Sequence, residues 1–373
     1  MTAPENVRSA NHAATTPDVS TPPHDNYYAS LIDWANPDDP IRKLASPLSG
    51  GLGGLNRWET QGLSRQEIMP GLQHVYGTNA TLNLTEDGIA GLEELKRSLG
   101  YIAEHPEINQ VLLTGVDALA LDEKSLAFVV SELRAIDHVR IIRLASQLPV
   151  REPSRIYAHE ALLSVIRTHS TPEKRIYLTV HINHPREITE EAKRALESLQ
   201  QAGAILVNRT HVLRGINDEA AVLAELLDRL VWSGVAPFYF FVQAPTESNA
   251  EFVLPLARAY QLIEEAKALA SGLGKRVRLS MSHASGMVEI LAIEQTKAYL
   301  KHYPTGNGQQ GRFLMVDCPQ DALWIDELEQ SAAEAAPAAE EPWVKRVPDL
   351  EIEIDLRPSI EDVVSVNMMP IGD

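Results

Sequence analysis

Cysteine is nearly absent from this sequence. Cys318 is the single cysteine among 373 residues, which excludes an internal disulfide and any metal site built from several thiolates. An iron–sulfur cluster normally takes about three or four thiolates, so this chain cannot hold one unaided. The absence therefore excludes disulfide scaffolds, zinc fingers and self-sufficient iron–sulfur proteins.

Positive charge is also scarce. The chain has 33 Lys and Arg against 51 Asp and Glu, a formal net charge of −18. Nucleic acid and anionic membranes would repel such a chain, so we expect neither as a partner. No apolar run reaches the roughly 18–20 residues of a membrane span, and residues 1–23 lack the apolar centre of a signal peptide. We expect a soluble, cytoplasmic protein.

The overall composition is ordinary for a chain that buries a core, with 44% apolar and 23% charged residues. The length suits two average domains, or one α/β barrel with extensions. The changes in composition along the chain predict five regions: a disordered leader at 1–26, a helical extension at 27–79, a partial (β/α) barrel at 80–275, a β extension at 276–326, and an Ala/Glu-rich linker with an acidic tail at 327–373.

Apolar runs of strand length alternate with segments of helical period from residue 80 onward. The predicted strands are Thr81–Leu84, Val111–Thr114, Val139–Leu144, Ile176–His181, Ala204–Asn208 and Pro237–Val242. The predicted helices are Ile89–His105, Lys124–Ile136, Ala158–Thr168, Thr189–Ala202, Glu219–Ser233 and Phe252–Ser271, with cap residue types at Thr189, Gly203 and Gly234. This alternation predicts an α/β fold of parallel strands, a partial (β/α)6 barrel.

After Gly274 the pattern changes. Val277–Met281, Val288–Ile293 and Lys297–His302 alternate in the way of antiparallel strands, and we expect them to close against the barrel. The acidic and apolar run DLEIEIDL at 349–356 fits either a partner-binding strand or a solvated edge.

Ligands of parallel barrels bind at the carboxyl ends of the strands, so the polar residues there are site candidates. They are Thr114, Gly115, Asp117, Arg143, Ser146, Gln147, His181, Asn183, His184, Asn208, Arg209, Arg214, Gln243, Ser282 and His283. Each one alone fits a helix cap or a buried hydrogen-bond partner. Together they follow from one topology and predict a ligand pocket.

The sequence lacks the motifs that several common kinds of site require. His181 and His184 lie in a loop that does not fix them on one face, so no metal site is predicted. Ser285 is in no G-x-S-x-G elbow, which argues against Ser-His-Asp hydrolysis. No predicted strand end carries a lysine for a Schiff base. The Gly-rich stretch 47–56 lacks the GK[ST] of a phosphate loop.

Several segments between Tyr27 and His302 carry a more specific signal: YYASLIDWANPDDPIRKL, LQHVYGTNATLNLT, EHPEINQVLLTGVDAL, ELRAIDHVRIIRLASQLPV, IYLTVHINHPREITEEAKRAL and AGAILVNRTHVLRGIND. They resemble the lysine 2,3-aminomutase family of radical S-adenosylmethionine enzymes. The resemblance implies a partial (β/α) barrel. It also implies a 4Fe–4S cluster on a CxxxCxxC loop after the first strand, S-adenosylmethionine, and pyridoxal phosphate bound to a lysine.

The sequence departs from the family pattern at two points. Thr85 to Gly88 follow the first predicted strand, where the family has its cysteine loop. Met287 follows the SHASG segment, where relatives carry the pyridoxal lysine, and a thioether cannot form an imine. We therefore expect no bound cofactor; of the three that the resemblance implies, S-adenosylmethionine is the one whose binding remains conceivable.

Other positions match the family and define ligand-binding candidates by resemblance. Gly115 and Asp117 resemble the ends of a GGD segment that meets the amino end of S-adenosylmethionine, and Arg209 replaces a glutamine. The candidate ligand-binding residues are Gly115, Asp117, Ser146, His181, Asn183, Asn208, Arg209, Arg214, Gln243 and His283. No catalytic residue and no metal ligand is assigned.

Two functional hypotheses follow. In the first, the chain has lost radical catalysis and binds an amino-acid-like or S-adenosylmethionine-like molecule, or a protein partner through its acidic tail. In the second, it is an aminomutase-like or other amino-acid-modifying enzyme. It would then use a cluster from a partner subunit, or acid–base chemistry with His181, His184 or His283 as base. By resemblance alone, a homo-oligomer is also expected.

Overall fold

The described part of the chain is organised by a sheet whose strands follow sequence order. The computed structural model describes residues 27–45, 67–84, 92–305 and 310–330, and in these ranges 13 strands each pair with the next. The strands are β1 (Glu67–Met69), β2 (Leu72–Val75), β3 (Asn79–Asn83), β4 (Gln110–Thr114), β5 (Ile141–Ser146), β6 (Arg175–His181), β7 (Ile205–His211), β8 (Ala236–Val242), β9 (Arg278–His283), β10 (Gly286–Glu294), β11 (Lys297–Pro304), β12 (Arg312–Asp317) and β13 (Glu329–Gln330). The predicted leader, the Gly-rich stretch, Thr85–Gly88 and the acidic tail lie outside the described residues.

Strands β3 to β9 are parallel, with helices in the connections. The helices are α3 (Leu92–Glu104), α4 (Glu123–Ala135), α5 (Leu148–Arg151), α6 (Ser154–Tyr157), α7 (Glu160–His169), α8 (Glu190–Gln201), α9 (Ala220–Trp232) and α10 (Leu256–Leu269). The predicted alternating α/β fold is therefore confirmed. Thr189 caps α8 by accepting from the backbone N–H of Ala192, and Gly203 and Gly234 follow their helices with positive φ.

Strand β9 corrects one prediction. The segment Val277–Met281 was expected to be antiparallel, but β9 pairs parallel to β8 and antiparallel to β10. The reason is α10, which supplies the same kind of crossover between β8 and β9 as the other helices supply between their strands. Strands β10, β11, β12 and β13 are antiparallel to their neighbours, as predicted for Val288–Ile293 and Lys297–His302.

The region predicted as a helical extension at 27–79 also contains strands. Its described helical parts are the 3-10 turn η1 (Tyr28–Leu31) and the helix α1 (Pro40–Ala45). From Glu67 to Val75 the chain instead forms the antiparallel strands β1 and β2, and β2 pairs with β3. Gly71, at φ +79°, permits the tight turn that brings β1 against β2.

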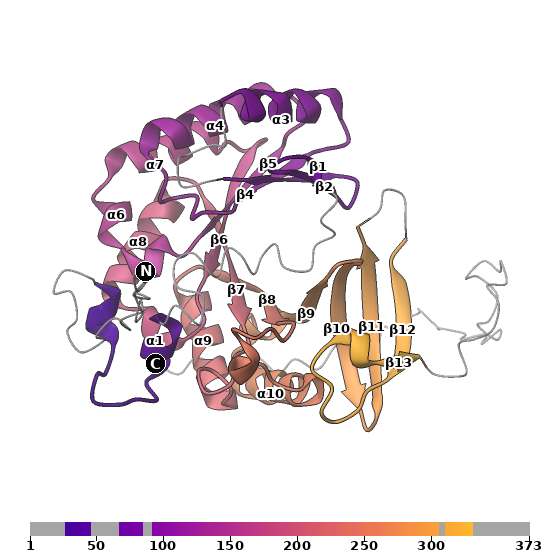
Figure 1. Ribbon diagram of the computed structural model, residues 1–373. Coiled ribbons are helices and arrows are strands. Elements are labelled where there is room, and N and C mark those ends of the chain that lie inside the picture. Colours follow the sequence, from indigo (N-terminus) through magenta and orange to yellow (C-terminus); the bar gives the residue numbers. More distant parts are fainter. Residues whose placement is uncertain (1–26, 46–66, 85–91, 306–309, 331–373) are drawn as a thin grey trace, which may run out of the picture. The chain divides into compact units, whose positions relative to one another are not determined.

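The two faces of the parallel strands differ in chemistry. Figure 1 shows the helices along the outside of the curved sheet, and the strand side chains on that side are buried aliphatic residues, such as Ile142, Leu178 and Leu206. We call the other face the inner face. The strand register places Arg143, Tyr177, Thr179, His181 and Arg209 there, because Cα partners in a ladder point to the same side. The inner face is thus rich in polar and cationic side chains.

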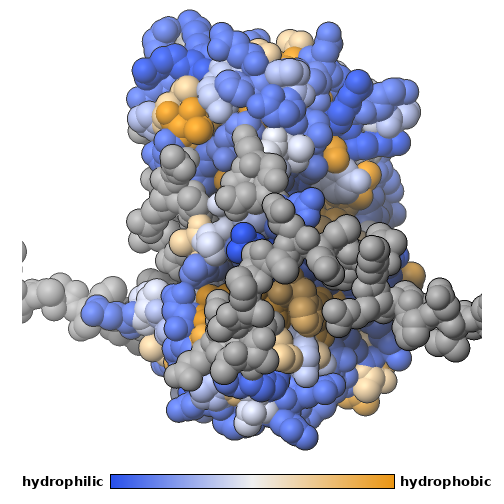
Figure 2. Space-filling view, turned by 90° about the vertical axis from the view of Figure 1, so that its right-hand side faces the viewer, coloured by the Kyte–Doolittle hydropathy of each residue, from blue (hydrophilic) through white to orange (hydrophobic). Residues whose placement is uncertain are grey.

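The antiparallel end of the sheet has a different surface. Figure 2, which looks onto this side of the molecule, shows mostly hydrophilic residues, with hydrophobic residues gathered in its lower half. Leu291 of β10 and Phe313 of β12 are the large apolar side chains of these strands with high exposure, 46% and 53%.

The N-terminal segment is held by polar contacts to the loop after β6 and to α5. Tyr28 donates its hydroxyl hydrogen to Glu187 at 2.8 Å, and the Arg151 guanidinium lies 3.7 Å from the Tyr28 ring centroid. Arg151 also donates to the carbonyl of Leu44, and Arg186 donates to that of Leu31. Two of the segments that resemble the aminomutase family, YYASLIDWANPDDPIRKL and the one containing HINHPREI, therefore fix each other in place.

We predict that Tyr28→Phe lowers the free energy of unfolding by about 1–3 kcal/mol. The buried Glu187 carboxylate would lose a donor that nothing else replaces. Urea unfolding followed by circular dichroism measures the change. Tyr157→Phe is the matched control, because Tyr157 donates to Glu191 near the surface and its loss should cost less than about 1 kcal/mol. Equal effects of the two substitutions would contradict this prediction.

Candidate functional site

Asp117 and Gly115 lie where β4 ends, and both are constrained by the backbone. Gly115 has φ +100°, and a Cβ atom there would lie 2.4 Å from the Leu84 carbonyl oxygen, so only glycine fits. The Asp117 carboxylate accepts from the N–H groups of Leu119, Gln147 and Leu148 at 2.7–3.1 Å. Burial raises the pKa of Asp117, and its hydrogen bonds, the one from Ser146 included, counteract that rise. Asp117 and Ser146 thus tie the end of β4 to that of β5.

Asn183 and Asn208 hold the next strand ends in the same manner. The Asn208 side chain accepts from the N–H of Ile182 at 3.0 Å and donates to the Ile182 carbonyl at 3.1 Å. Asn183 accepts from the N–H of His211 at 2.8 Å. Asn217, which sequence reasoning missed, donates to the carbonyls of Asn183 and His211. These amides bond to backbone and fix the loop after β6 beside β7.

His184 begins the 3-10 turn η3 (Pro185–Glu187) as its N-cap. Its Nδ1 accepts from the N–H of Arg186, and Glu187 accepts from the N–H groups of Asn183 and His184. Burial, with Arg186 adding to it, lowers the pKa of His184 to about 4. Burial raises the pKa of Glu187, while Arg151 and the hydrogen bonds oppose the rise. A neutral imidazole here is a structural cap.

Other predicted residues lie on the inner face. His181 is buried and its ring stacks near that of His211, with centroids 6.4 Å apart. Gln243 bonds to His211 Nδ1 at 2.9 Å, and the Arg209 guanidinium lies 4.1 Å from the Phe241 ring centroid. The structure therefore brings part of the predicted set together across β6, β7 and β8. Arg214, in contrast, is exposed outside this group.

Two buried glutamines, Gln147 after β5 and Gln73 of β2, have polar side-chain atoms without partners in the described part of the chain. Gln147 is 3% exposed, and neither its side-chain oxygen nor its nitrogen has a hydrogen-bond partner in the described part of the chain. Gln73, which sequence reasoning missed, is also 3% exposed, and its side-chain oxygen lacks a partner there too. Buried amide groups without partners are costly, so these two glutamines are candidates for contact with a bound polar molecule or water.

Tyr76 also reaches this region, and sequence reasoning missed it. It lies in the turn between β2 and β3 at φ +55°, and its N–H donates to the Thr305 carbonyl at 3.0 Å. Burial raises the pKa of its phenol, while a hydrogen bond with the Met287 backbone and the nearby charges of Arg209 and Arg143 lower it. The Met287 backbone is therefore within hydrogen-bonding reach of this phenol, and the charges of the two arginines act on it.

Met287 itself is in β10, opposite Ser282 of β9 and Tyr303 of β11. Glu289, two residues on, accepts from the Tyr303 hydroxyl at 3.0 Å and pairs with Arg278 at 3.5 Å. Glu289 thus has a cationic partner in Arg278. We take Arg143, Arg209 and Tyr76, with Gln147, as the candidate ligand site.

The hairpin between β9 and β10 holds a second polar group. His283 Nδ1 lies 2.7 Å from Ser285 Oγ, and its Nε2 lies 3.1 Å from Asp326 Oδ1. Ser285 Oγ also lies 2.9 Å from His302 Nε2. The missing G-x-S-x-G motif argued against a Ser-His-Asp set, yet the fold assembles one. Asp326 comes from the 3-10 turn η6 (Ile325–Glu327), too far along the sequence for any local signal.

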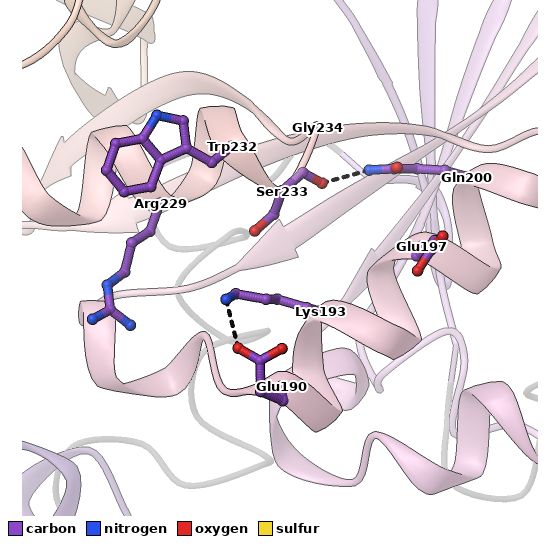
Figure 3. A pocket seen from close by; sticks show the side chains of 8 residues that line it. All are labelled: Glu190, Lys193, Glu197, Gln200, Arg229, Trp232, Ser233 and Gly234. Carbon is purple, nitrogen blue, oxygen red and sulfur yellow. Dashed lines mark hydrogen bonds and ion pairs between the residues drawn. The ribbon is translucent and has the colours of Figure 1, made fainter.

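A surface hollow of about 710 Å³ lies between α8 and α9. Figure 3 shows Trp232 and Arg229 on one side and the α8 side chains on the other. The lining residues are Glu190, Lys193, Glu197, Gln200, Arg229, Trp232, Ser233 and Gly234. Lys193 pairs with Glu190 and Arg229 with Glu225, both at 2.7 Å. The lysine and the arginine that line the hollow are thus each paired with a carboxylate, so we do not take this hollow as the candidate site.

Two kinds of site are absent from the described residues. In those ranges no three His, Cys, Asp or Glu side chains are grouped so that they would hold a metal ion. The described helices are also too short or too polar to cross a bilayer.

Comparison with known proteins identifies the family. No family model matches the chain. A protein of Aquifex aeolicus described as a putative L-lysine 2,3-aminomutase is 35% identical over 327 residues, which cover 83% of this chain and 87% of that protein. The chain belongs to the lysine 2,3-aminomutase family. The L-lysine 2,3-aminomutases of Acetoanaerobium sticklandii and Escherichia coli are 34% and 30% identical, over 66% of this chain and 63% and 75% of their own lengths.

Within this family the positions of two residues matter most. Cys318 follows β12, is 1% exposed, and donates weakly to the Pro319 carbonyl. Burial raises the pKa of its thiol, which disfavours the thiolate that a metal requires. Met287 places a thioether beside Tyr303, where the resemblance implies an amine.

We predict that His184 makes the folded state sensitive to acid. The pKa of His184 is about 4 in the folded protein, and its ordinary value, near 6.5, applies to the unfolded chain. As the pH falls, the unfolded chain therefore takes up a proton before the folded protein does. The stabilising contribution is thus complete above about pH 6.5 and is lost as the pH falls toward about 4. In His184→Asn, which keeps a capping oxygen, the loss of unfolding free energy between pH 7 and 5 should be about 1–2 kcal/mol smaller. Parallel pH curves for variant and wild type, measured by urea unfolding, would count against this.

Proposed function

We propose that this chain is a member of the lysine 2,3-aminomutase family that has lost radical catalysis and binds a small anionic molecule on its inner face. The loss of radical catalysis is inferred from the number of cysteine ligands available for an iron–sulfur cluster. Cys318 is the single cysteine in the sequence, and it is buried beyond β12. One protonated, enclosed thiol does not fit a 4Fe–4S cluster, so no step here is derived through one.

The pyridoxal site does not fit either. An imine needs a primary amine, and Met287 offers a thioether. Lys301 is on the same side of β11 as Tyr303, but it lies opposite Glu289, two ladder pairs away from Met287. The register thus gives Met287 no amine neighbour across the ladder. We infer that pyridoxal phosphate is not part of this protein's function.

The ligand class follows from charge. The charges of Arg143 and Arg209 both lower the pKa of Tyr76, and Gln147 adds an amide without a hydrogen-bond partner among the described residues. Guanidinium groups bind carboxylates and phosphates through paired hydrogen bonds. The molecules that the family resemblance implies, an amino acid or S-adenosylmethionine, both carry a carboxylate. We propose that this carboxylate binds the inner-face arginines.

The second hypothesis, an active enzyme with a cluster from a partner subunit or with histidine acid–base chemistry, has one observation in its favour. His283 is hydrogen-bonded to a carboxylate on one side and to a hydroxyl on the other. His184 Nδ1 is occupied as a cap of the turn η3, so His283 is better placed than His184 for an acid–base role.

Anaerobic treatment with iron and sulfide should leave the protein colourless, with less than about 0.1 cluster per chain. Treatment with pyridoxal phosphate and borohydride should leave no reduced adduct at Lys301 in a mass spectrum. Lys301→Ala is the control for adventitious reaction at that amine. A stoichiometric cluster, with iron measured by mass spectrometry and absorption near ~400 nm, would refute the loss of radical chemistry.

Thermal-shift titration with S-adenosylmethionine, S-adenosylhomocysteine, lysine and other amino acids should identify a ligand. At about 100 Kd a ligand adds roughly 2.7 kcal/mol to stability. Arg143→Gln should weaken binding about 10- to 100-fold, since a charged hydrogen bond contributes roughly 1.5–3 kcal/mol. Arg140→Gln, an exposed arginine just before β5, should leave the affinity unchanged. If both variants bind like the wild type, the ligand does not use the inner face.

A further inference from the structure

The polar group on the β9–β10 hairpin has directional hydrogen bonds, which can be assigned in order. The backbone N–H of Ser285 donates to His283 Nδ1 at 3.2 Å, and an N–H can only donate. Nδ1 is therefore the unprotonated ring nitrogen, and the ring proton sits on Nε2. That nitrogen lies 3.1 Å from Asp326 Oδ1, so the imidazole donates to the carboxylate.

The serine hydroxyl takes its direction from this tautomer. Ser285 Oγ is 2.7 Å from the same Nδ1, so its hydrogen points at the imidazole lone pair. His302 Nε2, at 2.9 Å, is then positioned as a donor to Oγ. The sequence of donors runs from His302 to Ser285 to His283 to Asp326. This is the polarity that a serine nucleophile needs, with a base 2.6–3.2 Å away and a carboxylate that orients the base.

The exposure of Ser285 and His283 suits the roles of nucleophile and base. Ser285 is exposed at the tip of the hairpin, so a substrate can approach its oxygen. His283 is half-buried, its side chain 24% exposed, which keeps the ring between its two partners. Gly286, at φ +142°, permits the close turn into β10: a Cβ atom there would lie 2.0 Å from the Tyr303 carbonyl oxygen.

We propose that Ser285 is a nucleophile, with His283 as its general base and Asp326 as the group that orients His283, and that it acts on small activated carboxylic esters. As the bond from Oγ to the carbonyl carbon forms, the Oγ proton moves to His283 Nδ1. The imidazolium then gives this proton to the leaving alcohol as the carbon–oxygen bond breaks. Water, deprotonated by His283, hydrolyses the acyl-serine and restores the hydroxyl. The net reaction consumes one ester and one water and yields one acid and one alcohol.

This site shares no residue with the inner-face group of Arg143, Arg209, Tyr76 and Gln147. Its chemistry also requires neither a metal nor a cofactor. It stands or fails independently of the proposed ligand-binding function.

The test uses the full chain and a fluorescent fluorophosphonate, which reacts covalently with activated serines and releases fluoride. We expect one label per chain, located on Ser285 by peptide mass spectrometry. Labelling should be absent in Ser285→Ala and should fall at least about tenfold in His283→Gln and Asp326→Asn, since a positioned general base contributes ~10²–10⁴-fold. Ser248→Ala removes an exposed serine far along the chain from both histidines and should label like the wild type.

A second variant keeps the test decisive if Ser285→Ala disturbs the hairpin. Ser285→Cys should react with iodoacetamide at least about tenfold faster in the presence of His283 than in the double variant with His283→Gln, because the histidine promotes the thiolate. The buried Cys318 serves as the slow internal reference. Labelling no faster than that of heat-denatured protein, or equal labelling in Ser285→Ala with the native melting temperature, would overturn the proposal and leave the group as a hydrogen-bonded turn.

Discussion

The loop after β6 and the N-terminal segment depend on one buried carboxylate, that of Glu187. It accepts from two backbone N–H groups of the loop after β6 and from the hydroxyl of Tyr28, and Arg151 provides the compensating charge. A buried carboxylate persists only when it is hydrogen-bonded and neutralised by its surroundings. The loop, α5 and the N-terminal segment must therefore assemble together, because each supplies part of what Glu187 requires.

The order of strands and helices was predictable because the spacing of apolar residues within each short segment indicates a strand or a helix without reference to the rest of the fold. The direction of β9 was missed because its alternation alone fits either ladder, although the helix predicted at Phe252–Ser271, observed as α10, already supplied the crossover of a parallel pair. Within the candidate site, the positions of the strand ends could be predicted from the sequence. The contacts that each side chain makes there could not. Asn208 and Arg209 are neighbours, yet one bonds to the Ile182 backbone and the other lies over Phe241. Asp326 could not be predicted at all, because only the folded chain brings it to His283.

In this protein, resemblance in sequence to the family does not by itself show that the family's chemistry is retained. The HINHP, GVD and VNRTH segments match the family, and in the structure Asp117, Asn183 and Asn208 bond to the backbone of neighbouring strands. Such residues are needed for the scaffold whatever reaction it supports. The residues that differ from the family pattern, Met287 and Arg209, both influence the Tyr76 phenol, which is part of the proposed ligand site. Family membership therefore fixes the architecture and leaves the activity open to experiment.

The hydrogen bond from Tyr76 to Thr305 has a consequence for how the chain acquires its structure. The two residues are more than two hundred positions apart, with every parallel strand between them. Closing a segment of that length is entropically unfavourable until the intervening units have compacted. We therefore expect the hydrogen bond between Tyr76 and Thr305 to form late in folding. Native-state hydrogen exchange would then find the β2–β3 turn among the first regions to open, well before the aliphatic layer beneath the helices.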